Sequence, residues 1–150
     1  MSLEQKGPAR TQALPERGLD MARIILCEDD EAIRAFVTRA LEMDGHEIIA
    51  AVDGEDGFDR LQDYEGAVDL LLTDIKMPFM DGIELAHSAS ALWPDLRILM
   101  MTGFADQRER TETLNALIVD VVSKPFTLAQ IRSEVAKALR YRIEPMRRTG

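Results

Sequence analysis

Four side chains in this sequence have the types and the spacing needed to bind a cation and accept a phosphoryl group. They are the carboxylates of Glu28, Asp29 and Asp74 and the amine of Lys124. Each follows a short apolar run of strand-forming residues, so each is expected close to the end of a strand. In open α/β sheets, sites assemble at the edge formed by the carboxyl ends of the strands. We therefore expect the three carboxylates and the amine to converge at one edge of a sheet.

The three carboxylates predict a magnesium site. Mg²⁺ prefers oxygen ligands and usually keeps several waters, so one or two carboxylates can hold it. Clustered carboxylates repel one another without a cation, and this repulsion creates the requirement for a metal. An alternative explanation for the acidic run at residues 28–30 is a helix N-terminus, where the helix dipole favours acidic side chains. We expect Asp30 to take that role.

Asp74 has the properties of a phosphoryl acceptor. It ends an apolar run, where a buried aspartate is costly unless it is solvated, paired or bound to a metal. A carboxylate can form an acyl phosphate when a metal and a lysine neutralise the incoming phosphate. Pro125 holds the backbone of Lys124 extended, so the Lys124 amine could pair with Asp74 and then with the phosphate. The Thr102 hydroxyl could also donate a hydrogen bond to the phosphate. The simpler alternatives are an aspartate that starts a turn and a threonine that caps one.

The rest of the sequence alternates between strand-like and helix-like segments. The expected strands are 24–27, 46–51, 68–73, 97–101 and 119–122. Helices are expected between and after them. The first carries Ile33, Phe36 and Val37 on its apolar face, the fourth spans 106–116, and the last is capped by Thr127. This alternation predicts an α/β fold in which a five-stranded parallel sheet carries helices on both faces.

Composition and charge limit the remaining possibilities. The 150 residues carry a net charge of −9, with 46% hydrophobic and 30% charged residues, which indicates a globular domain and argues against nucleic-acid binding. No apolar run reaches the roughly 18 residues needed to cross a membrane. The single Cys27 cannot form an internal disulfide, which favours the reducing cytoplasm. We expect a disordered leader at 1–21, one folded domain at 22–140 and a flexible basic tail at 141–150.

The order and spacing of these motifs resemble the receiver domain of two-component response regulators. The acidic pair Glu28–Asp29, the segment TDIKMPFMDG around Asp74, Thr102, and the segment KPF that begins at Lys124 carry the resemblance, which covers about residues 22 to 140. It implies a flavodoxin-like (βα)5 fold in a single domain. It also implies a signalling module that is not an enzyme and that takes its phosphoryl group from a histidine kinase or a histidine phosphotransfer protein.

The same resemblance implies a role for each site residue. Asp74 would be the phosphoacceptor, and Thr102 and Lys124 would sense the phosphate. Glu28, Asp29, Asp74 and the main-chain carbonyl of Lys76 would hold Mg²⁺. An output protein would bind the face formed by the helix at 106–116, the strand at 119–122 and the last helix. Within the family, the sequence is most similar to the stand-alone CpdR-type regulators of alphaproteobacteria, which implies control of regulated proteolysis and a protease complex as partner.

Three features depart from the family pattern. Val121 stands where the family usually has an aromatic switch residue, and a valine has no large ring to move between exposed and buried positions. Leu117–Ile118 replaces the usual Gly-Ala, and either both residues pack beneath the fourth helix or one is an exposed docking point beside Arg108 and Glu112. Phe104 could exclude water from the acyl phosphate, so we expect slow self-dephosphorylation. An unchanged phosphate lifetime in Phe104→Glu would contradict that shielding.

Two other functional classes can be weighed on the same residues. A Mg²⁺-dependent phosphohydrolase with an aspartyl nucleophile, of the haloacid dehalogenase type, needs a second aspartate two residues after the first, where this chain has Lys76. Turnover of generic phosphate esters would test that alternative. A flavin or nucleotide carrier needs a phosphate loop rich in Gly, Ser or Thr after the first strand. The segment EDDEAIR found there is acidic and would repel a phosphate that lacks a cation.

Overall fold

Five parallel strands form one sheet at the centre of the molecule. The structure is a computed structural model, and it describes residues 21–103, 114 and 116–141. The order across the sheet is β2-β1-β3-β4-β5, so β3 lies in the middle. The strands are β1 (Arg23–Cys27), β2 (Glu47–Ala51), β3 (Leu70–Asp74), β4 (Ile98–Thr102) and β5 (Asp120–Ser123).

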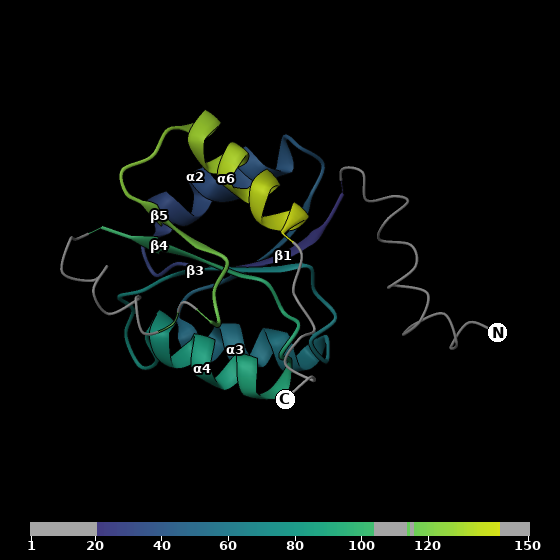
Figure 1. The fold of residues 1–150 in the computed structure, drawn as a ribbon. Coiled ribbons are helices and arrows are strands. Elements are labelled where there is room, and N and C mark those ends of the chain that lie inside the picture. Colours follow the sequence, from purple (N-terminus) through teal and green to yellow (C-terminus); the bar gives the residue numbers. More distant parts are fainter. Residues whose placement is uncertain (1–20, 104–113, 115, 142–150) are drawn as a thin grey trace.

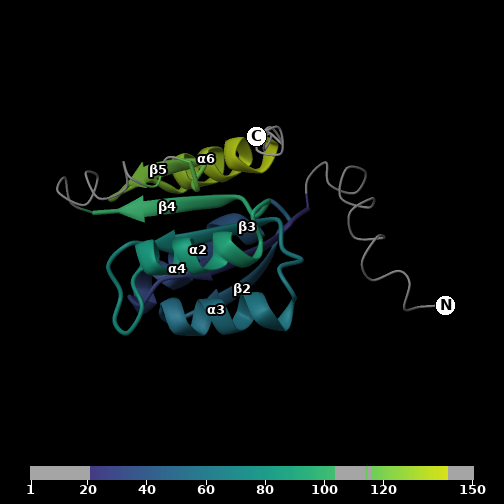
Figure 2. The same ribbon diagram turned by 60° about the horizontal axis from the view of Figure 1, so that its bottom comes forward.

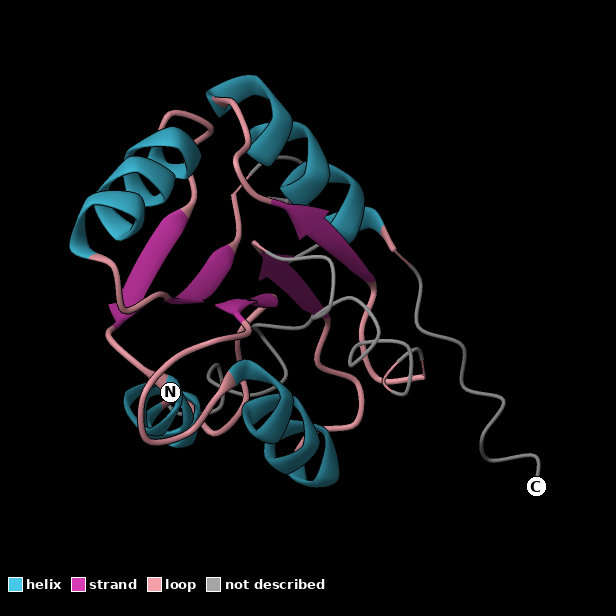
Figure 3. Ribbon diagram, turned by 90° about the vertical axis from the view of Figure 1, so that its left-hand side faces the viewer, coloured by secondary structure: helices cyan, strands magenta, loops and turns pink. Residues whose placement is uncertain are grey.

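Helices cover both faces of this sheet. The described helices are α2 (Glu31–Glu42), α3 (Gly54–Asp63), α4 (Gly82–Leu92) and α6 (Leu128–Arg140). Figure 1 shows α2 and α6 on one side of the sheet and α3 and α4 on the other, and Figure 3 shows the same layers from another direction. Because successive strand residues point to opposite faces, the core divides into two clusters. Ile25 and Cys27 pack on the side of α3 and α4, whereas Ile24 and Leu26 pack on the side of α2 and α6.

Each described helix begins at a polar cap. In every case, the cap side chain accepts a hydrogen bond from the backbone N–H of the third residue after it, which satisfies one of the free donors at a helix N-terminus. The caps are Asp30, Asp53, Asp81 and Thr127. This confirms the caps expected at Asp30 and Thr127. Within the described residues, no helix is both long enough and apolar enough to cross a bilayer.

The α/β class and the parallel sheet were predicted correctly, and the observed strand bounds differ by at most two residues from those expected. The expected helix at 106–116 lies outside the described residues except for 114 and 116, as do the leader apart from Met21 and the tail beyond Tyr141. Phe36 shares the helical spacing of Ile33 and Val37 but does not pack in the core with them. Its side chain is 36% exposed and stacks on Phe126, with ring centroids 6.5 Å apart, because it faces the loop before α6 and not the sheet.

Candidate functional site

The carboxyl end of β3 holds Asp74 in a fixed backbone setting. The Asp74 Oδ1 atom accepts a hydrogen bond from the backbone N–H of Ile75 at 2.9 Å, and the Gly82 N–H donates to the carbonyl of Ile75 at 2.7 Å. A Cβ at Gly82 would collide with the Asp74 carbonyl oxygen, so the start of α4 can lie against the strand end only because this residue is a glycine. The neighbouring backbone thus orients the side chain of Asp74, and this residue is 7% exposed.

Three carboxylates meet at this edge. Glu28, Asp29 and Asp74 each offer one carboxylate oxygen, and these oxygens all lie within 4.8 Å of one another. The first two follow β1 and the third ends β3, and these two strands are paired neighbours in the sheet. Glu28 is 1% exposed, whereas Asp29 is open to solvent. The cluster therefore has a buried wall and an open side.

Lys124 provides the positive charge of the site. It follows β5, and its Nζ donates to Glu28 Oε1 at 2.8 Å and to Asp74 Oδ2 at 3.1 Å. The pKa of Glu28 is raised, chiefly by burial and also by the nearby charge of Asp74, although the hydrogen bonds from Lys124 and from the backbone of Asp30 act to lower it. Burial lowers the pKa of Lys124, but its bonds to and attraction by the two carboxylates outweigh that effect, so the pKa is raised. The amine is therefore held in its charged form.

Arg34 supports the site and was missed by the sequence analysis. Its Nη1 donates to the main-chain carbonyl of Glu28 at 2.8 Å, which ties α2 to the acidic loop after β1. The Glu28 side chain is held from the other direction, because its Oε2 accepts from the Asp30 N–H at 3.1 Å. A lone arginine one helical turn past the cap carries no signal that identifies this contact. Only the folding of α2 over the loop creates it.

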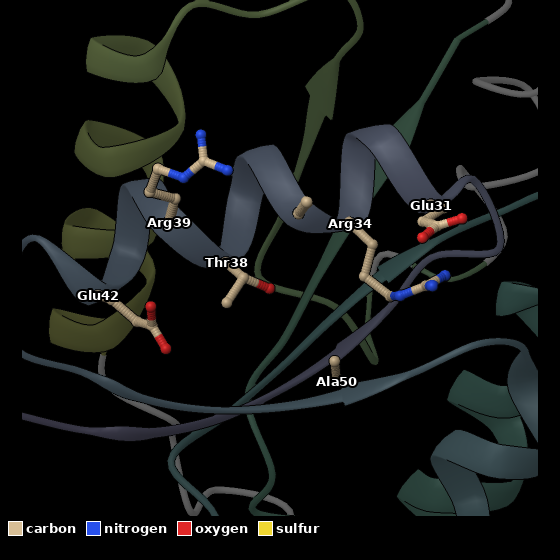
Figure 4. A pocket seen from close by; sticks show the side chains of 7 residues that line it. Glu31, Arg34, Thr38, Arg39, Glu42 and Ala50 are labelled. Carbon is tan, nitrogen blue, oxygen red and sulfur yellow. The ribbon is translucent and has the colours of Figure 1, made fainter.

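The side chain of Arg34 lies at one end of a groove of about 400 Å³ between α2 and β2. Figure 4 shows Glu31 beside it, Thr38 in the middle and Glu42 at the far end, with Ala50 across the groove. The groove is lined by Glu31, Arg34, Ala35, Thr38, Arg39, Glu42 and Ala50. Its lining contains two basic and two acidic side chains, and Arg34 links it to the acidic cluster through the Glu28 carbonyl.

Thr102 and Lys76 occupy different environments beside the cluster. Thr102 ends β4 and is 2% exposed. Its main-chain carbonyl accepts a hydrogen bond from the backbone N–H of Lys124 at 2.7 Å. The backbone of Lys124 is thus fixed to the neighbouring strand. The side chain of Lys76 points to solvent two residues after Asp74. The roles predicted for the Thr102 hydroxyl and for the Lys76 carbonyl remain predictions.

Lys124 also lines an apolar groove. The groove has a volume of about 420 Å³ and runs between the first turns of α2 and the loop that leads into α6. Its lining residues are Ala32, Ile33, Phe36, Gly103, Lys124, Pro125 and Phe126. The stacked pair Phe36–Phe126 forms part of this lining. The site therefore adjoins an apolar surface on the side of β5.

Of the two alternatives for Leu117–Ile118, inward packing is the one observed. Ile118 is 8% exposed and belongs to the core cluster beneath α3 and α4, and Leu117 is partly buried against the same cluster. The backbone N–H groups of both residues bond to the carbonyl of Leu114, which folds them inward. Val121 is also partly buried there. Phe104, Arg108 and Glu112 lie outside the described residues.

The donor set fits a hard divalent cation. It consists of carboxylate oxygens within reach of one centre, which is the ligand type that Mg²⁺ prefers, and the open side at Asp29 leaves room for waters. Lys124 balances only part of the negative charge of the three acids. The same edge therefore has both a place for a cation and a carboxylate, Asp74, that could act as a nucleophile.

Comparison of the sequence with known proteins gives a consistent assignment. The family model of the response regulator receiver domain matches residues 24–136. The response regulator receiver protein CpdR of Brucella abortus is 43% identical over 119 residues, which are 79% of this chain and 98% of that protein. The response regulator MprA of Mycobacterium avium is 31% identical over 118 residues, and the chain spans 51% of its length.

Solved structures agree with the sequence comparison. The CheY-like receiver domain protein of Methanospirillum hungatei superimposes with a TM-score of 0.72 at 29% identity, over 79% of this chain and 94% of that one. The response regulator TrrA of Thermotoga maritima, solved in complex with Mg²⁺-BeF, has a TM-score of 0.69 at 27% identity, over 77% and 97% of the two chains. On the family match over most of its length, the chain belongs to the response regulator receiver domain family.

Proposed function

We propose that Asp74 accepts a phosphoryl group from a phosphohistidine on a histidine kinase or a histidine phosphotransfer protein, with Mg²⁺ held at the same site. Glu28, Asp29, Asp74 and the main-chain carbonyl of Lys76 would be the protein ligands of the metal. One observation carries the proposal, namely the meeting of three carboxylates and one ammonium group around Asp74 at the carboxyl edge of the sheet. Receiver domains as a class signal through phosphoacceptance, which supports it.

The reaction makes one bond and breaks one bond. A carboxylate oxygen of Asp74 attacks phosphorus, the P–N bond to the donor imidazole breaks, and the imidazole nitrogen keeps the electron pair and takes up a proton. When bound, Mg²⁺ would neutralise charge on the phosphoryl oxygens. Lys124 already donates to Asp74 at 3.1 Å, so its ammonium can transfer that hydrogen bond to a phosphoryl oxygen with little movement. Ile75 holds the other Asp74 oxygen in place.

Phosphorylation would then change a protein-binding face. Thr102 and Lys124 sit beside Asp74 and connect it to β4 and β5, so a bond from either to the phosphate would bias the surface built on those strands. We extend the proposal to an output partner that binds the face of the 106–116 segment, β5 and α6. The resemblance of the sequence to CpdR-type regulators makes a protease complex and control of regulated proteolysis in the cytoplasm the roles to test first.

The test uses a small phosphodonor. We expect purified protein incubated with acetyl phosphate and Mg²⁺ to gain the mass of one phosphoryl group, and we expect EDTA to prevent the gain. Asp74→Ala should gain nothing, whereas Asp59→Ala, which removes an exposed acid on α3, should behave like the parent. Equal phosphorylation of Asp74→Ala and the parent would refute the assignment. Turnover of generic phosphate esters would favour the phosphohydrolase alternative instead.

A further inference from the structure

Phe79 is the most exposed large apolar side chain among the described residues. It is 81% exposed, while Met43 and Leu92, the next two, reach 58% and 54%. Its φ angle is +68°, in the left-handed region where residues other than glycine are strained. Glycine or asparagine would adopt this backbone at lower cost. For a phenylalanine, both the backbone conformation and the exposure of the ring to solvent are therefore unfavourable at this position.

The loop around Phe79 is held by backbone hydrogen bonds and is not a loose segment. The Met80 N–H donates to the carbonyl of Pro78 at 2.8 Å, and the Met80 carbonyl accepts from the Gly54 N–H at 3.1 Å. The loop ends at Gly82, whose N–H is bonded to Ile75 next to Asp74. Met80 packs against the core between these anchors. The ring of Phe79 is thus displayed outward from a fixed backbone.

This loop lies at the phosphoacceptor edge. It begins directly after Asp74, and Figure 2 shows the segment between β3 and α4 at the same end of the sheet as the tip of β4. A protein that delivers a phosphohistidine to Asp74 has to cover this edge, whereas an output partner has no such requirement. A rigid aromatic residue beside the reacting group is the kind of anchor that dominates protein interfaces when it enters an apolar pocket.

We propose that Phe79 is a docking and specificity residue for the phosphohistidine-bearing donor, inserting its ring into an apolar pocket on that protein. The inference rests on the proposed function, because it presupposes that Asp74 is the acceptor. It adds a contact on the β3–α4 side of Asp74, outside the apolar groove that borders Lys124. Phe79 touches no reacting atom in this assignment. Its effect is confined to donor proteins and does not extend to small phosphodonors.

The test compares protein and small-molecule donors on Phe79→Gly. The source organism's histidine kinases and phosphotransfer proteins are purified and charged with labelled phosphate, and the one that reacts fastest with the parent chain is the probe. Because a buried aromatic anchor is among the costliest interface residues to remove, we expect a fall of about tenfold in kcat/KM for transfer. Acetyl phosphate should phosphorylate both chains equally. The melting temperature should stay the same or rise, because glycine relieves the strained φ.

Two further variants separate docking from damage. Phe79→Tyr keeps the ring and should keep most of the transfer rate, and Leu92→Ala removes a comparably exposed side chain at the other end of α4 and should leave it unchanged. Transfer to Phe79→Gly within about twofold of the parent overturns the inference, and so does an equal fall with acetyl phosphate. If the parent gains no phosphate from either kind of donor, the proposed function itself fails, and Phe79 loses its role with it.

Discussion

Replacing Lys124 with methionine tests how the acidic cluster is balanced. Lys124→Met keeps an unbranched side chain of similar size and removes the only ammonium group that contacts Glu28 and Asp74 in the described part of the chain. The lost bonds are 2.8 Å and 3.1 Å long. Glu28 is 1% exposed, so water cannot take the place of the amine at its carboxylate. The variant therefore leaves a buried charge without its partner.

The expected loss of stability is about 3 kcal/mol. Removing one member of a buried ion pair costs about 3–5 kcal/mol, and the low end applies because the Lys124 side chain is 17% exposed. The contribution of Glu28 to this loss of stability cannot exceed the free energy needed to protonate it, because a neutral carboxyl group no longer needs a charged partner. Keeping a glutamate of ordinary pKa, about 4.3, neutral near pH 7.5 costs about 4 kcal/mol at about 1.36 kcal/mol for each pH unit.

The assay is urea unfolding followed by fluorescence of the single tryptophan, Trp93, first in EDTA and then with added Mg²⁺. At about one hundred times its Kd, a ligand that binds only the folded state restores about 2.7 kcal/mol. We expect Mg²⁺ to stabilise the variant more than the parent, because no amine competes for the carboxylates. Lys137→Met is the control, since Lys137 is 63% exposed and its pair with Glu134 should contribute less than about 1 kcal/mol. A metal-free loss no larger than that of the control would refute this reasoning.

The remaining predictions concern residues near the amino ends of the strands, away from the site. Gly66 has a φ of +76°, and a Cβ there would collide with the indole of Trp93, so Gly66→Ala should lose about 3 kcal/mol in a urea titration. Gly103→Ala is the control, because a Cβ at Gly103 meets no atom within 4 Å, and equal losses in the two variants would contradict the prediction. The hydrogen-bonded guanidinium of Arg132 lowers the pKa of Asp44. The Asp44 carboxylate therefore contributes stability above the ordinary aspartate pKa, and this stability is lost as the pH falls through the lowered pKa. Asp44→Asn should therefore reduce the acid-dependent fall in Tm, and identical plots of Tm against pH for the two proteins would contradict it.

The sequence alone determined the fold class and the identity of the clustered side chains. Short apolar runs followed by Glu28, Asp74 and Lys124 are local patterns, and a parallel sheet necessarily brings the carboxyl ends of its strands to one edge. The caps at Asp30 and Thr127 were readable for the same reason, since a cap bonds to a backbone group only three residues away.

Only the tertiary structure decided how these groups are connected. From the sequence, Lys124 was expected to pair with Asp74, but its shorter bond is to Glu28. The bond from Arg34 to the Glu28 carbonyl was not foreseen. The exposure of Phe36 and the burial of Ile118 were also decided by neighbouring elements. Contacts of this kind depend on the distance and angle at which one helix or loop crosses another, and those quantities are set by the packing of the whole core and leave no trace in local spacing.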